Sequence, residues 1–213
     1  FTIGYSKGGF KIGVGAGLNV CKIKERNYSD RNSSMIGYDV AIPMEIKVAK
    51  YFAIQPEIHF IQKGFSLSSY MVYVSTEYRK RNFIEFPILF KALFTIKEKN
   101  TLSFFTGVGV GYAMANVQFL KYIDGHKKRN KLPFDTNIDD DGIAYNKLDI
   151  TVPVGFGYEY KINDKLALYT DLRWNLDVNN NIKYKVKPSP EPYYKYRNFI
   201  FSVGLFYIAK SRD

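Results

Sequence analysis

The sequence predicts an all-β protein, an eight-stranded antiparallel up-and-down transmembrane β-barrel with short periplasmic turns and long extracellular loops. In about eight segments, Ile, Val, Leu, Phe and Tyr alternate with Gly, Ser, Asp, Glu and Lys, which is the two-residue period of a β-strand. Charges recur at mid-strand, so we expect the apolar set to face lipid and the polar set to face a closed lumen. Short and long connections alternate along the chain, as they do in outer-membrane barrels.

The predicted strands are longer than those of most globular sheets. They match the roughly 9–11 residues that cross a bilayer at a tilt rather than the usual 5–6. The segment 82–95 shows the clearest alternation, with Ile84 and Phe86 on one face and Glu85 and Lys91 on the other. The eight segments cover residues 8–20, 35–49, 53–65, 82–95, 102–112, 148–159, 166–177 and 199–207.

The connections between these segments fall into two classes. The short ones lie near residues 50–51, 97–100 and 163–164, and the long ones cover residues 21–34, 66–81, 120–147 and 179–196. We therefore expect residues 1–213 to form a single barrel domain, with both termini on the short-turn, periplasmic side.

Composition agrees with a barrel in a membrane. The chain has 18 Tyr and 17 Phe, which suits aromatic girdles at the membrane interfaces. Its mean hydropathy of −0.23 does not argue against this, because lumen residues and loops lower the average.

Cys21 is the only cysteine and is expected to be a small residue at a strand end. No export signal is visible at Phe1, so we expect the numbering to begin after cleavage or within a truncated chain.

Glycine recurs on the predicted lumen face. Gly13, Gly15 and Gly17 lie in the first segment, and further glycines lie in the fifth and sixth. Because an eight-stranded barrel has little room inside, small residues are expected to alternate with large ones there.

Charged residues on the lumen face are expected to form a paired network that fills the barrel, since charges away from water need partners. The alternative is a small gated pore or proton path. The lumen face holds more acidic than basic positions, so the net charge of +11 must come from loops and ends. The predicted network comprises Lys11, Glu45, Lys47, Glu57, His59, Lys63, Glu85, Lys91, Asp149, Glu159, Asp171 and Arg173.

Basic residues in the predicted long loops are expected at the outer surface. There they can contact lipid phosphates or an acidic partner, or simply be solvated. Because these charges lie in the loops of a membrane barrel, we do not expect a nucleic-acid partner. The candidate contacts are Arg79, Lys80, Arg81, Lys127, Lys128 and Arg129.

No catalytic motif or cofactor signature is present. His59 falls beside Glu57 on the lumen face and is expected to be a network residue, and His126 lies in a basic loop without an obvious partner. The acidic stretch from Asp135 to Asp141 resembles the front half of a calcium loop but lacks its closing glutamate. We therefore expect no cofactor and no metal. The proline-rich segment 187–194 is interpreted as an extended return to the last strand.

Four segments resemble the PorT-like outer-membrane β-barrel family. They are Ile54-Gln-Pro-Glu-Ile-His-Phe-Ile-Gln-Lys-Gly64, Asn82-Phe-Ile-Glu-Phe-Pro-Ile-Leu-Phe-Lys91, the opening Gly9-Phe-Lys-Ile-Gly13 through Gly17-Leu-Asn19, and Asp171-Leu-Arg-Trp-Asn175. The resemblance spans most of the chain and implies a barrel in the outer membrane of a Gram-negative bacterium. Some members of that family are accessory factors for secretion or envelope assembly, and the family offers no agreed catalytic residues.

The expected function is that of a non-enzymatic structural or accessory subunit of a larger outer-membrane complex. Its expected partners are membrane lipid, lipopolysaccharide and other outer-membrane or periplasmic proteins. Three alternatives stay open at this point: a small gated pore, a lipid-modifying barrel enzyme and a soluble ligand-carrying barrel.

Overall fold

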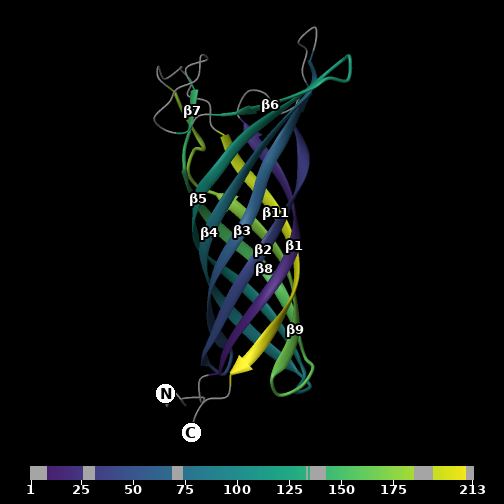
Figure 1. Ribbon diagram of the computed structural model, residues 1–213. Coiled ribbons are helices and arrows are strands. Elements are labelled where there is room, and N and C mark those ends of the chain that lie inside the picture. Colours follow the sequence, from purple (N-terminus) through teal and green to yellow (C-terminus); the bar gives the residue numbers. More distant parts are fainter. Residues whose placement is uncertain are drawn as a thin grey trace.

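Antiparallel strands wind around one axis to form a closed barrel (Figure 1). The computed structural model describes residues 9–25, 32–68, 74–132, 134, 143–184 and 194–209. The strands are β1 Phe10–Glu25, β2 Asn32–Ala49, β3 Phe52–Ser68, β4 Val74–Ile96, β5 Asn100–Tyr122, β6 Lys127–Lys131, β7 Ile143–Tyr145, β8 Leu148–Lys161, β9 Leu166–Asp177, β10 Ile182–Tyr184 and β11 Tyr194–Ala209.

Strand pairing closes the ring. The main sheet has nine strands in the order β4-β3-β2-β1-β11-β9-β8-β5-β6, and β4 also pairs with β5. Because β6 pairs only with β5, it lies outside the ring, and nine strands less this one leave eight in the barrel. The predicted eight-stranded antiparallel barrel is therefore confirmed. Phe10 and Ala209 are register partners, so β1 begins and β11 ends at the same, short-turn end.

The outer wall is apolar and the lumen is polar at mid-barrel. In β4, Phe86 is 53% exposed whereas its neighbour Glu85 is 2% exposed. The same alternation runs through every strand of the ring, so apolar side chains cover the wall between the two ends. In a water-soluble protein this exposed apolar surface would be exceptional. In a membrane barrel it is expected, because the outer wall faces the hydrocarbon chains of the lipid. The described residues contain no helix that is long and apolar enough to span a membrane.

The strands extend further toward the long-loop end than the sequence predicted. Residues 66–81 and 120–147 were expected to be loops, but β3 continues to Ser68, β4 begins at Val74 and β5 ends at Tyr122. The prediction was wrong because beyond the bilayer a strand no longer needs an apolar outer face. The alternation therefore fades while the hydrogen-bonded pairing of β4 and β5 continues.

The lumen glycines make room for large side chains. Gly15 and Gly204 are register partners on β1 and β11. A Cβ atom on Gly15 would lie 2.2 Å from the hydroxyl oxygen of Tyr169, and one on Gly204 would lie 2.5 Å from the Cζ atom of the same ring. The buried ring of Tyr169 thus occupies the space that two absent side chains leave free.

Candidate functional site

The lumen at the short-turn end holds a chain of ion pairs. Lys11 Nζ lies 2.7 Å from a Glu159 oxygen and 2.8 Å from a Glu45 oxygen, and Lys91 Nζ lies 2.8 Å from the other oxygen of Glu45. Lys91 also donates to Gln55 Oε1 at 2.7 Å, and Gln55 Nε2 donates to Glu57 at 2.6 Å. These side chains come from β1, β2, β3, β4 and β8, so the chain of contacts crosses the barrel.

Glu57 connects this chain to the middle of the barrel. The two terminal guanidinium nitrogens of Arg173, Nη1 and Nη2, donate to the two oxygens of Glu57 at 2.6 and 3.0 Å, which is the bidentate geometry that favours arginine. His59 lies between two carboxylates, with Nε2 2.7 Å from Glu57 and Nδ1 2.7 Å from Asp39. Both ring nitrogens therefore have partners already, and Arg173 also approaches Asp171 at 3.8 Å.

Lys63 forms a second cluster toward the long-loop end. Its ammonium lies 2.6 Å from Asp149, 2.7 Å from Glu85 and 3.4 Å from Asp177, and its side chain is fully buried. Asn181 donates to Asp177 at 2.8 Å and extends the cluster upward. A single buried cation that holds three carboxylates is expected to be indispensable to the packing around it.

The long-loop end of the lumen is apolar and aromatic. A buried cluster there contains Cys21, Ile23, Ile61, Phe65, Phe83, Ala113, Tyr196 and Ile200, and Phe134 and Tyr194 pack against it. Phe134 lies between β6 and β7 in the sequence, and its side chain packs against the cluster at the mouth of the barrel. The packing of Phe134 at the mouth was not predicted, because nothing in the strand pattern marks this residue.

Arg81 lies inside this aromatic cluster. Its Cζ atom is 4.8 Å from the centroid of Phe83, 5.7 Å from that of Phe134, 5.7 Å from that of Tyr145 and 6.0 Å from that of Tyr196. The guanidinium also donates to Asn181 Oδ1 at 3.1 Å and to the carbonyl oxygen of Asn146. Residues from the wall and from the long connections thus meet at one buried cation.

The structure brings nearly all of the predicted lumen residues together. Every member of the predicted network except Lys47 takes part in the ion pairs described above. Lys47 is half-buried at the short-turn end and forms no ion pair within the described residues. Buried pairs of this kind contribute little net stability compared with apolar packing, yet losing one partner is costly.

The prediction that Arg79, Lys80 and Arg81 belong to a surface loop was wrong. All three lie in β4, where side chains alternate between the two faces. Arg81 is 1% exposed and lines the lumen. Arg79 lies on the same side and donates to Glu77 and to the hydroxyl of Tyr145. Only Lys80 projects outward, and the continued alternation from Glu85 through Phe83 to Arg81 is the signal that could have shown this.

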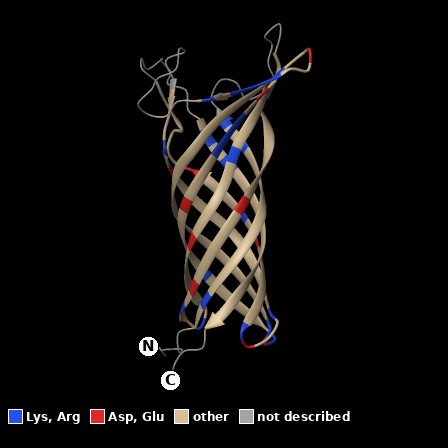
Figure 2. Cartoon of the chain, in the orientation of Figure 1, with Lys and Arg blue, Asp and Glu red and all other residues tan. Residues whose placement is uncertain are grey.

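The second group of predicted contact residues is also divided between the two faces of a strand. Lys127, Lys128 and Arg129 all lie in β6, whose register places Lys127 opposite Lys121 and Arg129 opposite Phe119, whereas Lys128 is opposite Leu120. Lys127 and Arg129 therefore share the outer face, and Lys128 lies on the other face. Figure 2 shows these basic residues gathered at the long-loop end of the barrel.

The remaining candidates have no site-like surroundings. Cys21 is a free, fully buried thiol in the apolar cluster. His126 is exposed, with its ring 6.1 Å from that of Tyr122. Residues 135–141, the possible calcium loop, and residues 187–193 lie outside the described residues, and among the described ones no cluster of His, Cys, Asp and Glu could hold a metal ion.

Comparisons with known proteins agree with this geometry. The family model for the outer membrane protein beta-barrel domain matches residues 5–181. No match is found among curated proteins.

Several solved outer-membrane barrels are similar to this chain. The outer membrane protein OprG from Pseudomonas aeruginosa is 10% identical with a TM-score of 0.51, and 97% of this chain and 98% of that chain are covered. The outer membrane protease OmpT from Escherichia coli is 13% identical with a TM-score of 0.48, covering 98% and 99%. Ail from Yersinia pestis, in complex with the heparin analogue sucrose octasulfate, is 13% identical with a TM-score of 0.42, covering 93% and 98%. At these identities the likeness concerns the fold alone.

Proposed function

The chain belongs to the family of outer membrane protein beta-barrel domains, and from that premise we propose that it is a closed, non-enzymatic barrel that serves as a structural or accessory subunit of a larger outer-membrane complex. Family membership gives its location, the outer membrane of a Gram-negative bacterium, and is incompatible with a soluble ligand-carrying barrel. The accessory role and the non-enzymatic character are the parts that are proposed.

One observation carries the proposal: among the described residues, buried side chains contact one another across the lumen at the short-turn end, in the middle and at the mouth. Ion pairs cross the lower and middle barrel, and the Arg81 cluster lies at the mouth. An eight-stranded barrel has an interior just wide enough for its own side chains. A barrel whose described lumen residues are paired with one another suits a protein that acts through its outer surfaces and its loops.

The surroundings of His59 support a structural role for this residue. A general base needs a ring nitrogen that can reach a substrate proton. In this lumen both nitrogens of His59 lie 2.7 Å from carboxylate oxygens, and Arg173 lies 3.2 Å from Nε2. The histidine therefore acts as a connector between Asp39 and Glu57.

Purification of the tagged full-length protein in mild detergent, at native expression level, tests the proposal. We expect mass spectrometry to find a partner protein in stoichiometric amount. A barrel that elutes alone, and that conducts ions in planar bilayers with a current altered by Glu85→Gln or Lys91→Gln, would overturn the accessory role in favour of a gated pore. A lone barrel that changes the structure of a lipid, with the change lost in His126→Ala, would instead favour a lipid-modifying enzyme.

A further inference from the structure

Strands β4, β5 and β6 continue beyond the ring as a three-stranded ribbon with one strongly basic face. The register places Lys121 opposite both Thr76 and Lys127, Phe119 opposite both Tyr78 and Arg129, and Val117 opposite both Lys80 and Lys131. Residues opposite one another in an antiparallel pair share a face. We call the outer face formed by Tyr78, Lys80, Val117, Phe119, Lys121, Lys127, Arg129 and Lys131 the ribbon patch.

The cations of the ribbon patch are unpaired, unlike those of the lumen. None of its five basic residues forms an ion pair within the part of the chain that the structure describes. The opposite face of the same ribbon is well paired: Glu77 accepts from Arg79 and from Gln118, and Gln118 accepts from Asn130. A concentration of unneutralised charge on one face is an electrostatic attraction for an anion.

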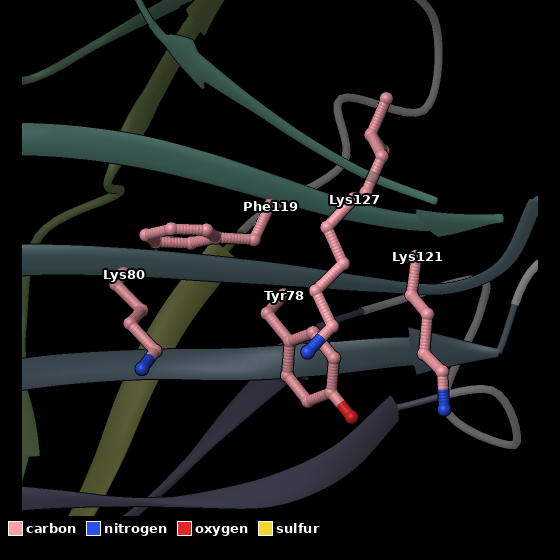
Figure 3. Close-up of a pocket in the computed structure, with 6 residues that line it drawn as sticks. Tyr78, Lys80, Phe119, Lys121 and Lys127 are labelled. Carbon is pink, nitrogen blue, oxygen red and sulfur yellow. The ribbon is translucent and has the colours of Figure 1, made fainter. Parts of the chain in front are cut away.

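Two hollows indent the ribbon patch. The larger, about 360 Å³, is lined by Tyr78, Lys80, Phe119, Leu120, Lys121 and Lys127. The smaller, about 190 Å³, shares Lys80 and Phe119 with it and continues toward the barrel past Gln62 and Asn82. Figure 3 shows the side chains of Lys80, Lys121 and Lys127 on the same side of the ribbon, with Tyr78 between Lys80 and Lys121.

The ring of Phe119 holds two of the cations close together. Lys80 Nζ lies 5.5 Å from the centroid of Phe119, and Arg129 Cζ lies 5.8 Å from it on the neighbouring strand. Such cation–π contacts orient both charges around one ring. The patch thus combines a flat apolar floor with several cations, which is the surface that a sugar bearing phosphate groups would fit.

The height of the ribbon patch above the apolar wall indicates which layer of the membrane surrounds it. On β4 the outward residues change from Ile84 to Asn82 and then to Lys80. Lys80 is four residues beyond Ile84, which at about 3.3 Å per residue and a tilt of about 45° raises it roughly 9 Å above Ile84. The head-group layer is about 5–7 Å thick on each side, so the backbone of Lys80 lies near the outer edge of this layer, and its long side chain can reach back to the level of the lipid phosphates.

We propose that the ribbon patch binds the phosphorylated head group of an outer-leaflet glycolipid. Lys80, Lys121, Lys127 and Arg129 donate charge-assisted hydrogen bonds to phosphate oxygens. Tyr78 and Phe119 support the sugar, and the acyl chains lie along the apolar wall below. This site is independent of the accessory role proposed above, since it uses the outer wall and requires no partner protein.

The apolar floor and the height favour a lipid over a soluble polyanion or an acidic protein. A soluble polyanion would need charges that project into water, whereas the smaller hollow extends toward the apolar wall, where Asn82 and Ala115 line it. Lysine side chains at such a boundary cover apolar surface with their carbon chains and keep their ammonium groups at the polar level.

Binding of bisphosphorylated lipid A to the full-length protein in detergent tests the inference, with dephosphorylated lipid A, inorganic phosphate and a sulfated oligosaccharide as comparison probes. The test variant changes Lys80, Lys121, Lys127 and Arg129 to glutamine. The chain offers a matched control, because the register pairs Lys22 with Arg197 and Lys24 with Lys195 on the outward side of β1 and β11. Changing these four residues to glutamine removes the same charge just above the apolar wall of another strand pair.

We expect the ribbon-patch variant to bind bisphosphorylated lipid A at least about tenfold more weakly, and the β1–β11 control to change less than about threefold. Dephosphorylated lipid A should bind the unaltered protein as weakly as bisphosphorylated lipid A binds the variant. Equal weakening of lipid A binding in both variants would show that basic residues anywhere around this end of the barrel attract the lipid, and would overturn a specific site at the ribbon patch. Tighter binding of the sulfated oligosaccharide than of lipid A would overturn the lipid as occupant. Unchanged circular dichroism and gel mobility before heating would show that both variants fold.

Discussion

Lys80 and Arg81 are neighbours in β4, yet their surroundings are opposite. Arg81 points into the lumen, where four aromatic rings and two hydrogen-bond acceptors surround its guanidinium. Lys80 points outward, where it lies near Phe119 and other cations and meets no carboxylate among the described residues. The comparison shows that the face of the strand, and not the residue type, decides whether a cation is buried among partners in the lumen or lies without an ion pair on the outer surface.

Among changes to buried lumen cations, removal of Lys63 is expected to lower the stability of the barrel most strongly. In Lys63→Met, three carboxylates lose their shared cation, and we expect the free energy of unfolding to fall by about 3–5 kcal/mol. Urea unfolding in lipid vesicles, followed by the fluorescence of the single tryptophan, Trp174, measures this change. Adding Asp149→Asn should recover part of the loss. A loss below about 1 kcal/mol would contradict a structural network.

Replacing Arg81 and, separately, Arg129 compares how much a lumen cation and an outer-face cation contribute to stability at the same end of the barrel. Arg81→Met loses a buried charged hydrogen-bond donor and its contacts with the aromatic rings, so we expect unfolding to become easier by about 2–3 kcal/mol. Arg129→Met, on the exposed face, should change the free energy of unfolding by no more than about 0.5 kcal/mol. Thermal unfolding in one detergent compares the two variants, and similar losses would show that the mouth of the barrel is not held by Arg81.

A methyl group added to the lumen face tests how tightly it is packed. Gly15→Ala places a Cβ against the hydroxyl of Tyr169, and we expect a loss of about 1–3 kcal/mol in the free energy of unfolding. Tyr169→Phe removes the clashing oxygen, so the double variant should regain part of that loss. Gly9→Ala is the control, because no atom lies within 4 Å of its added Cβ. Equal effects of Gly15→Ala and Gly9→Ala would contradict a crowded lumen.

The smallest expected effect belongs to an ion pair outside the lumen. Lys161 and Asp164 lie 2.7 Å apart in the turn after β8, with side chains 40% and 83% exposed. Lys161→Gln should cost no more than about 1 kcal/mol, and that difference should vanish in 1 M salt. The loss in Lys63→Met should persist at the same salt concentration, because buried charges are screened far less. Equal salt dependence would mean that water reaches the Lys63 cluster.

Much of the barrel could be predicted from the sequence. The alternation in residues 82–95 identified Glu85 and Lys91 as lumen residues and Phe86 as a wall residue, and the structure agrees. The prediction succeeds because the lipid-facing side of a membrane strand needs an apolar side chain at every second position. The two-residue period of the strand is therefore visible in the sequence. The same reasoning failed for residues 74–81, where polar surroundings replace the hydrocarbon layer and the strand continues without a continuous apolar face.

The partners within the lumen could not be predicted in the same way. Lys11 meets Glu159 across 148 positions of sequence, and Arg173 meets Glu57 across 116. Each pair depends on the register of several strands and on closure of the ring by β4 and β5. Pattern analysis lists the residues on a face, but it does not give their height along the barrel axis.

The sequence by itself determined the strand period, the two faces and the location in a membrane, because these follow from the solvent that each face meets. Only the tertiary structure decided which carboxylate each cation contacts, that Phe134 packs against the cluster at the mouth, and that Lys80 joins Lys121, Lys127 and Arg129 on one outer face. These features arise when hydrogen bonds fix the register between strands that are distant in sequence. The period of one strand carries no information about its alignment with the next.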